Sequence, residues 1–348
     1  MNRWIPTRTA VLASLAMVAG CTPPNAEEAE PQFRPPDLVG PAPWTGPDFV
    51  EVDADDEFTF AVFSDLTGGE RDGVFDVAVA QLALLRPELI MNVGDLIEGD
   101  SDDVAGLARE WDVFDARAAR VPAPMFRVGG NHDLTSPEMR DAWAQRFGPL
   151  YYHFVYKDVL FLVLDTEDYT DLRRSEIHRA RSEALDALYG GQPDVALGME
   201  YYQMPERVTG DIGPTQSAYI QDAIAQNPDV RWTLLFMHKP VWQRDDEPEF
   251  AAIETALGDR PYTVFNGHLH SFSHTVKNGR DHIMLGTTGG AQNARDEAAF
   301  DHVTLITMTG QGPQIAHLRM DGILDKTGHI PLGGDTLCFQ ASRCGGGW

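Results

Sequence analysis

The chain has 348 residues, of which 43% are hydrophobic and 9% aromatic, enough to form a sizeable buried core. Its formal net charge is −26 at pH 7, from 27 basic and 53 acidic residues. So acidic a surface disfavours nucleic acid and anionic lipid headgroups, and we expect no nucleic-acid-binding surface. Adaptation to a saline habitat would give the same acidic excess without a functional reason, and the sequence does not indicate an oligomeric state.

The first twenty residues are typical of an export signal. They hold two arginines, no acidic residue, and an apolar run over 10–19. This run is too short to cross a bilayer but suits a signal peptide. It ends in the sequence VAGC, which resembles the lipobox of bacterial lipoproteins. We therefore expect a signal peptide over 1–20, a lipid on Cys21, and an exported protein held by that lipid at a bacterial membrane, facing the periplasm. The alternative is an ordinary secretory signal in which Cys21 is incidental.

Three further segments follow the signal. Residues 21–56 begin with the lipidated cysteine, are rich in proline and acid, and predict an extended linker. The folded domain is expected over 57–320, and a C-terminal extension over 321–348. In the extension, Cys338 and Cys344 are six positions apart. In an oxidising compartment they are expected to form a disulfide, with two free thiols as the alternative.

Within the folded domain, short apolar strands alternate with helical patterns. Three buried strands and the helices between them are expected over 58–65, 73–86, 88–95, 104–119 and 123–130. This order favours parallel strands with right-handed crossovers. A hairpin at 151–165 and further strands are expected later in the chain, over 232–238, 262–268, 282–288 and 302–308. The sequence thus predicts an α/β fold with a mixed sheet or pair of sheets flanked by helices.

A long insertion, residues 166–216, separates the hairpin from the next helix. It starts at the same edge of the sheet as the candidate site residues described next. One interpretation is a cap that shapes the access of substrate. The other is a purely structural excursion.

Polar residues with metal-binding side chains stand at the ends of five expected strands. They are Asp65, Asp95, Asn131, His238, and the pair His268 and His270. Ligands of open α/β sheets gather at the carboxyl ends of the strands, because the loops converge there. Imidazole together with carboxylate suits Zn, Fe or Mn, whereas an all-oxygen set suits Mg or Ca. One such residue alone is more often structural, but their joint placement predicts a metal centre.

Five sequence blocks resemble the calcineurin-like metallophosphoesterase superfamily, in that family's order. They are Ser64-Asp65, GDLIE at 94–98, GNHD at 130–133, His238, and GHLH at 267–270. The resemblance covers about 57–310. It implies a four-layer α/β/β/α sandwich of two mixed β-sheets flanked by helices, and two metal ions bridged by a carboxylate.

Carried over residue by residue, the resemblance implies a role for each candidate. Asp95 would bridge the metals. The second metal would also take Asn131, His238 and His268, and the first metal would also take Asp65 and His270. His132 would be the general acid and Glu98 the acidic partner that orients it. The alternative for Glu98 is a solvated loop acid.

The implied activity is hydrolysis of a phosphomonoester or phosphodiester by a metal-activated water. The substrate would be a phosphorylated small molecule or lipid, and the cofactors two divalent or trivalent ions, with Mn, Fe or Zn expected. The N-terminal lipid would be the only contact with a membrane.

One position departs from the family's pattern. Where the family's first block usually has Asp-x-His, this chain has Thr67, followed by Gly68, Gly69 and Glu70. A hydroxyl is a poor replacement for imidazole on a transition metal. The first metal is therefore expected to be weak or to be Mg or Mn, with Thr67, Glu70 or a water as substitute ligand. Two alternatives follow, a one-metal phosphodiesterase and a catalytically impaired binding or scaffold lipoprotein.

Overall fold

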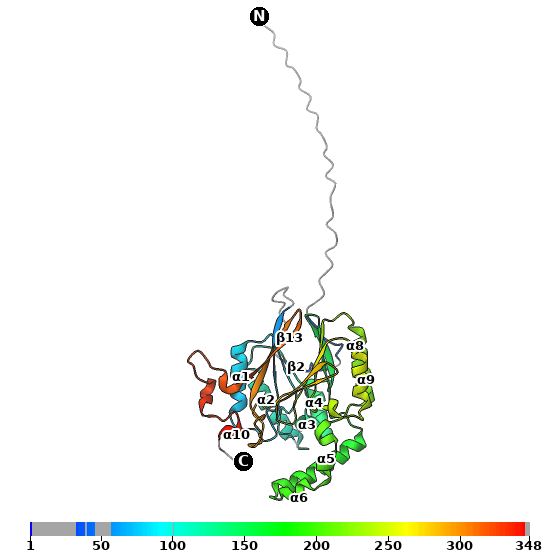
Figure 1. Cartoon of the computed structure of the whole chain (residues 1–348), viewed down its shortest axis with the longest axis vertical. Coiled ribbons are helices and arrows are strands. Elements are labelled where there is room, and N and C mark those ends of the chain that lie inside the picture. The colour runs from blue at the N-terminus through cyan, green and yellow to red at the C-terminus, as the bar shows by residue number, and fades with distance from the viewer. Residues whose placement is uncertain (2–32, 39, 46–56, 100, 345–348) are drawn as a thin grey trace. The chain divides into compact units, whose positions relative to one another are not determined.

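The computed structural model describes Met1 and residues 33–38, 40–45, 57–99 and 101–344 (Figure 1). The expected signal peptide and Cys21 lie outside the described residues. Within the described ranges, no helix combines the length and the apolar character needed to span a bilayer.

Two mixed β-sheets form the centre of the fold (Figure 1). The seven-stranded sheet has the order β1 (Phe33–Arg34), β6 (Tyr152–Tyr156), β7 (Val159–Val163), β8 (Trp232–Phe236), β9 (Tyr262–Asn266), β11 (Arg280–Met284) and β10 (Ser273–Lys277). The six-stranded sheet has the order β13 (Gly312–Arg319), β12 (His302–Thr309), β3 (Phe58–Phe63), β4 (Leu89–Asn92), β5 (Met125–Phe126) and β2 (Trp44–Thr45). Strands β3, β4 and β5 are parallel, as the alternation of strands and helices predicts.

Helices cover the outer face of each sheet. The six-stranded sheet shares an apolar cluster with α1 (Val74–Leu85), α2 (Val104–Ala118) and α4 (Pro137–Phe147). The seven-stranded sheet shares another with α8 (Pro214–Gln226) and α9 (Pro248–Leu257). The order of layers is therefore α/β/β/α, which confirms the expected fold class.

The two sheets bury their inner faces against each other. On β3, Phe60 and Val62 belong to the cluster between the sheets, whereas Ala61 and Phe63 belong to the cluster under α1. This alternation follows from the two-residue period of a strand. Across the gap, Phe126 stacks on Phe154 with ring centroids 4.1 Å apart. Because both faces of each central strand are covered, the strands read as continuous apolar runs.

Two short strands correct the expectation of a spacer over residues 21–56. Phe33 of β1 pairs with β6, and Trp44 of β2 pairs with β5, so each adds an edge strand to one of the sheets. The two rings meet edge to face, with centroids 5.7 Å apart. Isolated aromatic residues in a proline-rich segment thus anchor it to the core, a contact that periodicity alone does not reveal.

The C-terminal extension packs on the domain. It contains η3 (Met320–Gly322), η4 (Pro331–Thr336) and α10 (Ala341–Cys344). Ile330 and Phe339 bury their side chains in the same cluster as α1. The structure joins Cys338 and Cys344 in a disulfide with Cα atoms 6.1 Å apart, as the sequence predicts for an exported protein.

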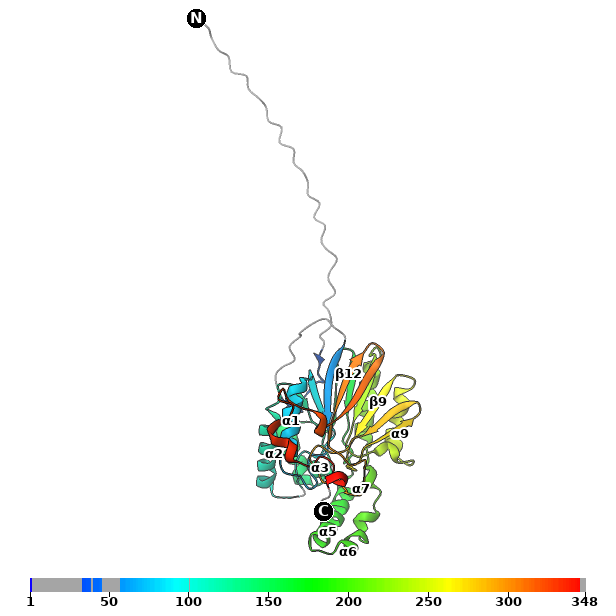
Figure 2. The same cartoon turned by 60° about the vertical axis from the view of Figure 1, so that its left-hand side comes forward.

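The insertion forms a helical segment, residues 166–213, here called the cap. It contains α5 (Asp171–Tyr189), α6 (Pro193–Leu197), η1 (Glu200–Gln203) and α7 (Glu206–Thr209). A small apolar cluster of its own, which includes Ile177, Ala184 and Tyr201, holds these helices together. Figure 1 and Figure 2 both show α5 and α6 beyond the end of the sheets at which α3 (Asn131–Leu134) lies. The cap therefore lies at the end of the fold that carries the candidate ligands.

Candidate metal centre

The loops that carry the candidate ligands turn sharply at the ends of their strands. Asp65 follows β3 with φ 33°, and Asp95 follows β4 with φ 58°. His268 and His270, after β9, have φ 80° and 54°. Left-handed backbone is uncommon for residues other than glycine and concentrates at functional sites, where the surrounding structure holds it in place. Four of the six candidate ligands share this feature.

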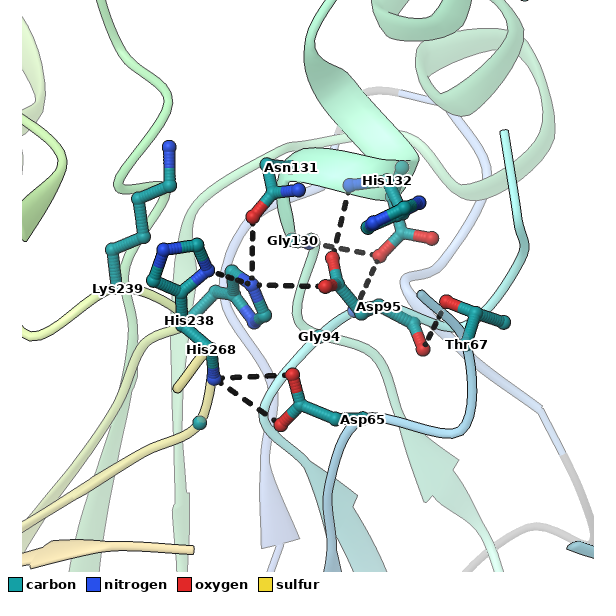
Figure 3. Close-up of polar contacts among 12 residues, drawn as sticks. Asp65, Thr67, Gly94, Asp95, Gly130, Asn131, His132, His238, Lys239 and His268 are labelled. Carbon is teal, nitrogen blue, oxygen red and sulfur yellow. Dashed lines mark hydrogen bonds and ion pairs between the residues drawn. The ribbon is translucent and has the colours of Figure 1, made fainter. Parts of the chain in front are cut away.

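Glycine allows these loops to approach each other closely. A Cβ atom at Gly94 would lie 2.7 Å from Nδ1 of His238 and 2.9 Å from the Cα of Gly130. Real Cβ atoms do not come so close, so both blocks, GDLIE and GNHD, need their glycine to meet His238. The side chains of Asp95, Asn131 and His238 then point into one place (Figure 3).

One group of ligand atoms, here called the second position, is formed by Asp95, Asn131, His238 and His268. His238 Nε2 lies 3.2 Å from Asp95 Oδ2, 3.2 Å from Asn131 Oδ1 and 3.2 Å from His268 Nδ1. Asp95 and His238 are almost completely buried. The four residues expected to share a metal are therefore brought together, with their donor atoms facing one another.

A second group, the first position, is formed by Asp65, Asp95 and His270. Their ligand atoms all lie within 4.8 Å of one another, and His270 Nε2 is 3.4 Å from Asp65 Oδ1. Asp65 also accepts the backbone N–H of His268 at 3.1 Å, which ties the two positions together. Asp95 belongs to both groups, as a bridging carboxylate would.

The three histidines are oriented as metal ligands are. His238 places Nδ1 2.8 Å from the carbonyl of Val93, and His270 places Nδ1 2.6 Å from the carbonyl of Ala291. His268 places Nε2 2.6 Å from the carbonyl of Arg207. A carbonyl only accepts, so a hydrogen belongs on each of these nitrogens, and the other nitrogen of each ring faces the ligand groups: Asp95 for His238, Asp65 for His270 and His238 for His268. Acceptors converging in a buried place fit a cation, and this donor set suits Zn, Fe or Mn.

In the metal-free protein a proton takes part of the cation's role. Burial lowers the pKa of His238, but the Asp95 carboxylate more than offsets this and raises the pKa to about 9. Burial would also raise the pKa of Asp95, yet the charges of His238 and His132 bring it well below its ordinary value. A metal at the second position would displace that proton, because His238 must be neutral to bind it.

Asp133, the last letter of GNHD, is a residue of the site that our sequence reasoning missed. Its buried carboxylate accepts the backbone N–H groups of Asp95 and Gly130, both at 2.8 Å, and that of Leu96 at 3.0 Å. Burial and the nearby Asp95 charge raise the pKa of Asp133 to about 7. Asp133 thus fixes the loop that carries Asp95. The block GNHD could have indicated this role, because it ends in an acidic residue directly after the candidate ligand and general acid.

Neither substitute ligand proposed from the sequence reaches the first position. The Thr67 hydroxyl is buried and donates to the backbone carbonyl of Asp95 at 3.0 Å. The Glu70 carboxylate lies 2.6 Å from Arg117 in an ion pair. Thr67 therefore stabilises the loop of Asp95 through a hydrogen bond, and Arg117 holds the Glu70 carboxylate outside the ligand group. Among the residues that the structure describes, Asp65, Asp95 and His270 remain as candidate ligands of the first position.

His132 is oriented by Glu98, but through a different atom from the one we expected. His132 Nδ1 lies 2.6 Å from the backbone carbonyl of Glu98. The Glu98 carboxylate instead accepts the backbone N–H groups of Gly69, at 3.0 Å, and of Glu70, at 2.6 Å. The side chain of Glu98 thus holds the loop after Thr67, and its main chain orients His132. The backbone N–H of His132 in turn donates to Asp95 at 2.9 Å.

The cap forms one wall of an open cavity over these residues. The cavity has a volume of about 370 Å³ and is lined by Asp95, Asn131, His132, His268 and His270 from the sheet ends. From the cap it is lined by Arg181, Leu185, Tyr189, Tyr201, Tyr202 and Arg207. The cap residues were not identified from the sequence, because only the folded cap brings them to the ligands. Of the two interpretations of the insertion, the structure supports a segment that bounds the site.

Comparisons with known proteins agree with this geometry. The profile of the calcineurin-like phosphoesterase family matches residues 58–272. Among solved structures, a dimetal phosphatase from Danio rerio is 14% identical, with a TM-score of 0.50 over 75% of this chain and 98% of that one.

Two further solved structures are similar at comparable identity. GAP50, the anchor in the inner membrane complex of Plasmodium, is 12% identical, with a TM-score of 0.49 over 79% of this chain and 87% of that one. A purple acid phosphatase from yellow lupin (Lupinus luteus) is 13% identical, with a TM-score of 0.46 over 75% and 53%. No curated protein matches the chain. The structural likenesses concern the fold, whereas the family profile covers more than half of the sequence. The chain belongs to the calcineurin-like phosphoesterase family and is a hydrolase of phosphoester bonds.

Proposed function

We propose that the protein hydrolyses a phosphoester at a dinuclear metal centre whose two positions share Asp95. The observation that carries this proposal is the membership of Asp95 in both ligand groups. It is supported by the three histidines, each of which turns one nitrogen to a backbone carbonyl and the other into the ligand groups. When bound, the metals supply Lewis-acid activation of water and of the phosphoryl group.

His132 is the general acid of this proposal. Its Nδ1–H donates to the carbonyl of Glu98, which fixes the ring, and its Nε2 faces the cavity. A proton on Nε2 is transferred to the leaving oxygen as the ester bond breaks. Asn131 immediately precedes His132 in α3, and its side chain points to His238. The short helix α3 therefore carries both the general acid and one of the candidate metal ligands.

The two metal positions are proposed to differ in affinity. The second position has two imidazoles, a carboxylate and an amide oxygen, whereas the first has two carboxylates and one imidazole. Mn or Mg, with water completing the coordination, competes better at the first position than at the second, because harder ions prefer oxygen ligands.

Metal analysis combined with assays tests the proposal. The metal-free protein is reconstituted with Mn, Fe or Zn, the bound metal is counted, and p-nitrophenyl phosphate and bis(p-nitrophenyl) phosphate are assayed. We expect two metals per chain at saturation and activity that rises with the second equivalent. Full activity with one metal would favour the one-metal phosphodiesterase. Binding of two metals without turnover of either ester would favour the scaffold alternative.

We also propose that the chain is exported and anchored by a lipid on Cys21, which is consistent with the disulfide Cys338–Cys344, since disulfides persist in oxidising compartments. Mass spectrometry of protein extracted from membranes is expected to show an acylated cysteine at the N-terminus. An unmodified N-terminus elsewhere in the chain would contradict the anchor.

A further inference from the structure

Arg181 of helix α5 lies directly beside the general acid. Its Nη2 is 3.4 Å from Nε2 of His132. Its Nη1 donates to the hydroxyl of Tyr201 at 2.7 Å, and the guanidinium lies over the Tyr201 ring at 5.6 Å. Arg181 is only 7% exposed. Burying a guanidinium costs desolvation free energy. We therefore expect Arg181, which lines the cavity next to His132, to have a functional role.

The charge of the cavity wall contrasts with that of the protein. The chain carries a net charge of −26. Yet Asp95, already a metal ligand, is the only acid among the described residues that line this cavity, and the cap contributes two arginines, Arg181 and Arg207. An acidic protein repels anionic substrates at long range, and cations at the site offset this repulsion locally. The lining of the cap is therefore suited to an anion.

We propose that Arg181 binds a charged non-bridging oxygen of the substrate phosphate and makes the site selective for phosphomonoesters over phosphodiesters. This inference rests on the proposed function and names its substrate class. A monoester is a dianion near neutral pH, whereas in a diester one further oxygen carries an organic group instead of charge. A guanidinium recognises charged phosphate oxygens through directional, charge-assisted hydrogen bonds. In this proposal Arg181 meets the oxygen that carries charge in a monoester and the second organic group in a diester, so the charge-assisted bond forms with the monoester alone.

The contact between Arg181 and His132 fits this role. In the protein without substrate, Nη2 of Arg181 lies 3.4 Å from Nε2 of His132, and Nδ1 of His132 lies 2.6 Å from the carbonyl of Glu98. The arriving phosphate takes over the N–H of Arg181, and this leaves Nε2 of His132 available to carry the proton for the leaving oxygen. No group is oxidised or reduced. Water forms the new P–O bond as the ester P–O bond breaks. The leaving oxygen takes the proton from Nε2 of His132 and departs as the alcohol, and the proton that the attacking water releases restores His132.

The test compares Arg181→Gln, Arg181→Lys and Arg179→Gln in the metal-loaded full chain. Arg179 is a matched control, because it stands on the same helix with its side chain 52% exposed, paired with Glu183 and Glu200. Calorimetry measures the binding of inorganic phosphate. We expect Arg181→Gln to weaken it about 10- to 100-fold, the effect of one hydrogen bond to a charged group. Arg181→Lys should lose less, and Arg179→Gln should bind as the wild type does.

Assays of both esters complete the test. In Arg181→Gln, kcat/KM for p-nitrophenyl phosphate is expected to fall by the same factor as phosphate binding, with a much smaller loss for bis(p-nitrophenyl) phosphate. Metal content and melting temperature should stay at wild-type values. Equal losses for both esters, or unchanged phosphate binding, would overturn the role of Arg181 while leaving the proposed function intact. A wild type that binds two metals but neither phosphate nor ester would overturn both.

Discussion

The two metal positions are built from the same scaffold but are unequally equipped. The second position combines Asp95 and Asn131 with two imidazoles, all four residues at the ends of strands. The first position shares Asp95, and within the described part of the chain it has a single imidazole, that of His270. At the place where the family usually supplies another histidine, Thr67 uses its hydroxyl to hold the backbone carbonyl of Asp95. In this chain, therefore, the position after Asp65 and Leu66 supplies a structural hydrogen bond and no metal ligand.

The largest effect is expected from Asp95→Asn, which removes the carboxylate that both positions share. Activity should fall roughly 10³-fold or more, because bound metals contribute several kcal/mol of charge stabilisation. Metal analysis should show loss of both ions under conditions that saturate the wild type. If one ion were kept with unchanged affinity, the two positions would not depend on a common ligand.

His132→Ala comes next, with kcat lowered about 10²-fold or more for an alkyl phosphate, since the leaving alkoxide then lacks a proton donor. The loss should shrink with p-nitrophenyl phosphate, whose leaving group needs no proton. Metal content should not change. Glu98→Gln is the matched control: it keeps the backbone carbonyl that orients His132, so its loss should be much smaller. An equal loss in Glu98→Gln would return the orienting role to the carboxylate.

Asp133→Asn tests the support under the bridging ligand. Replacing the carboxylate brings an amide NH₂ group against backbone N–H donors, so the loop of Asp95 loses part of its support. Metal affinity is expected to fall about 10- to 100-fold, the usual effect of changing a residue that orients a ligand. Titration of metal into the metal-free protein measures it. Asp141→Asn, at an exposed position of α4, serves as control and should titrate as the wild type does.

The smallest effect is expected from Thr67→His, which restores the family's usual block. An added imidazole should tighten the first position alone, by about tenfold or roughly 1.4 kcal/mol. Thr67→Val, similar in shape to threonine, separates the loss of the hydroxyl from the gain of a ligand and should not tighten binding. Glu70→Ala should leave both affinities unchanged, because Glu70 is paired with Arg117. Weaker metal binding in Glu70→Ala would show that this carboxylate reaches the centre after all.

The sequence predicted those strands whose residues are apolar over the whole length of the strand. Buried strands such as β7 and β8 show as apolar runs, and residues that follow them, including His238, could be placed from the strand ends. Strand β13 escaped prediction, because its run begins with Gly312-Pro313 and mixes exposed with partly buried positions. β1 and β2, of two residues each, are too short to have a period.

The metal-binding side chains of the site could be predicted from the sequence. The roles that depend on a main-chain hydrogen bond or on a tertiary contact could not. The six candidate ligands and His132 are brought together as the motifs indicate. The role of Glu98 was misassigned, because a hydrogen bond to a backbone carbonyl leaves no mark on residue type. Arg181 was missed because it stands in a charged helix among several arginines, and only the packing of α5 distinguishes it from Arg179.

The carbonyl of Arg207 has a consequence for how this enzyme can be altered. It belongs to α7 of the cap, yet it accepts the hydrogen bond that orients His268, at 2.6 Å. The inserted segment is therefore not a separable module that can be exchanged at will. A transplanted segment that brings new specificity would have to place an acceptor at the same spot. Otherwise the His268 ring would be left free to rotate, and the recipient would lose catalysis along with its old preference.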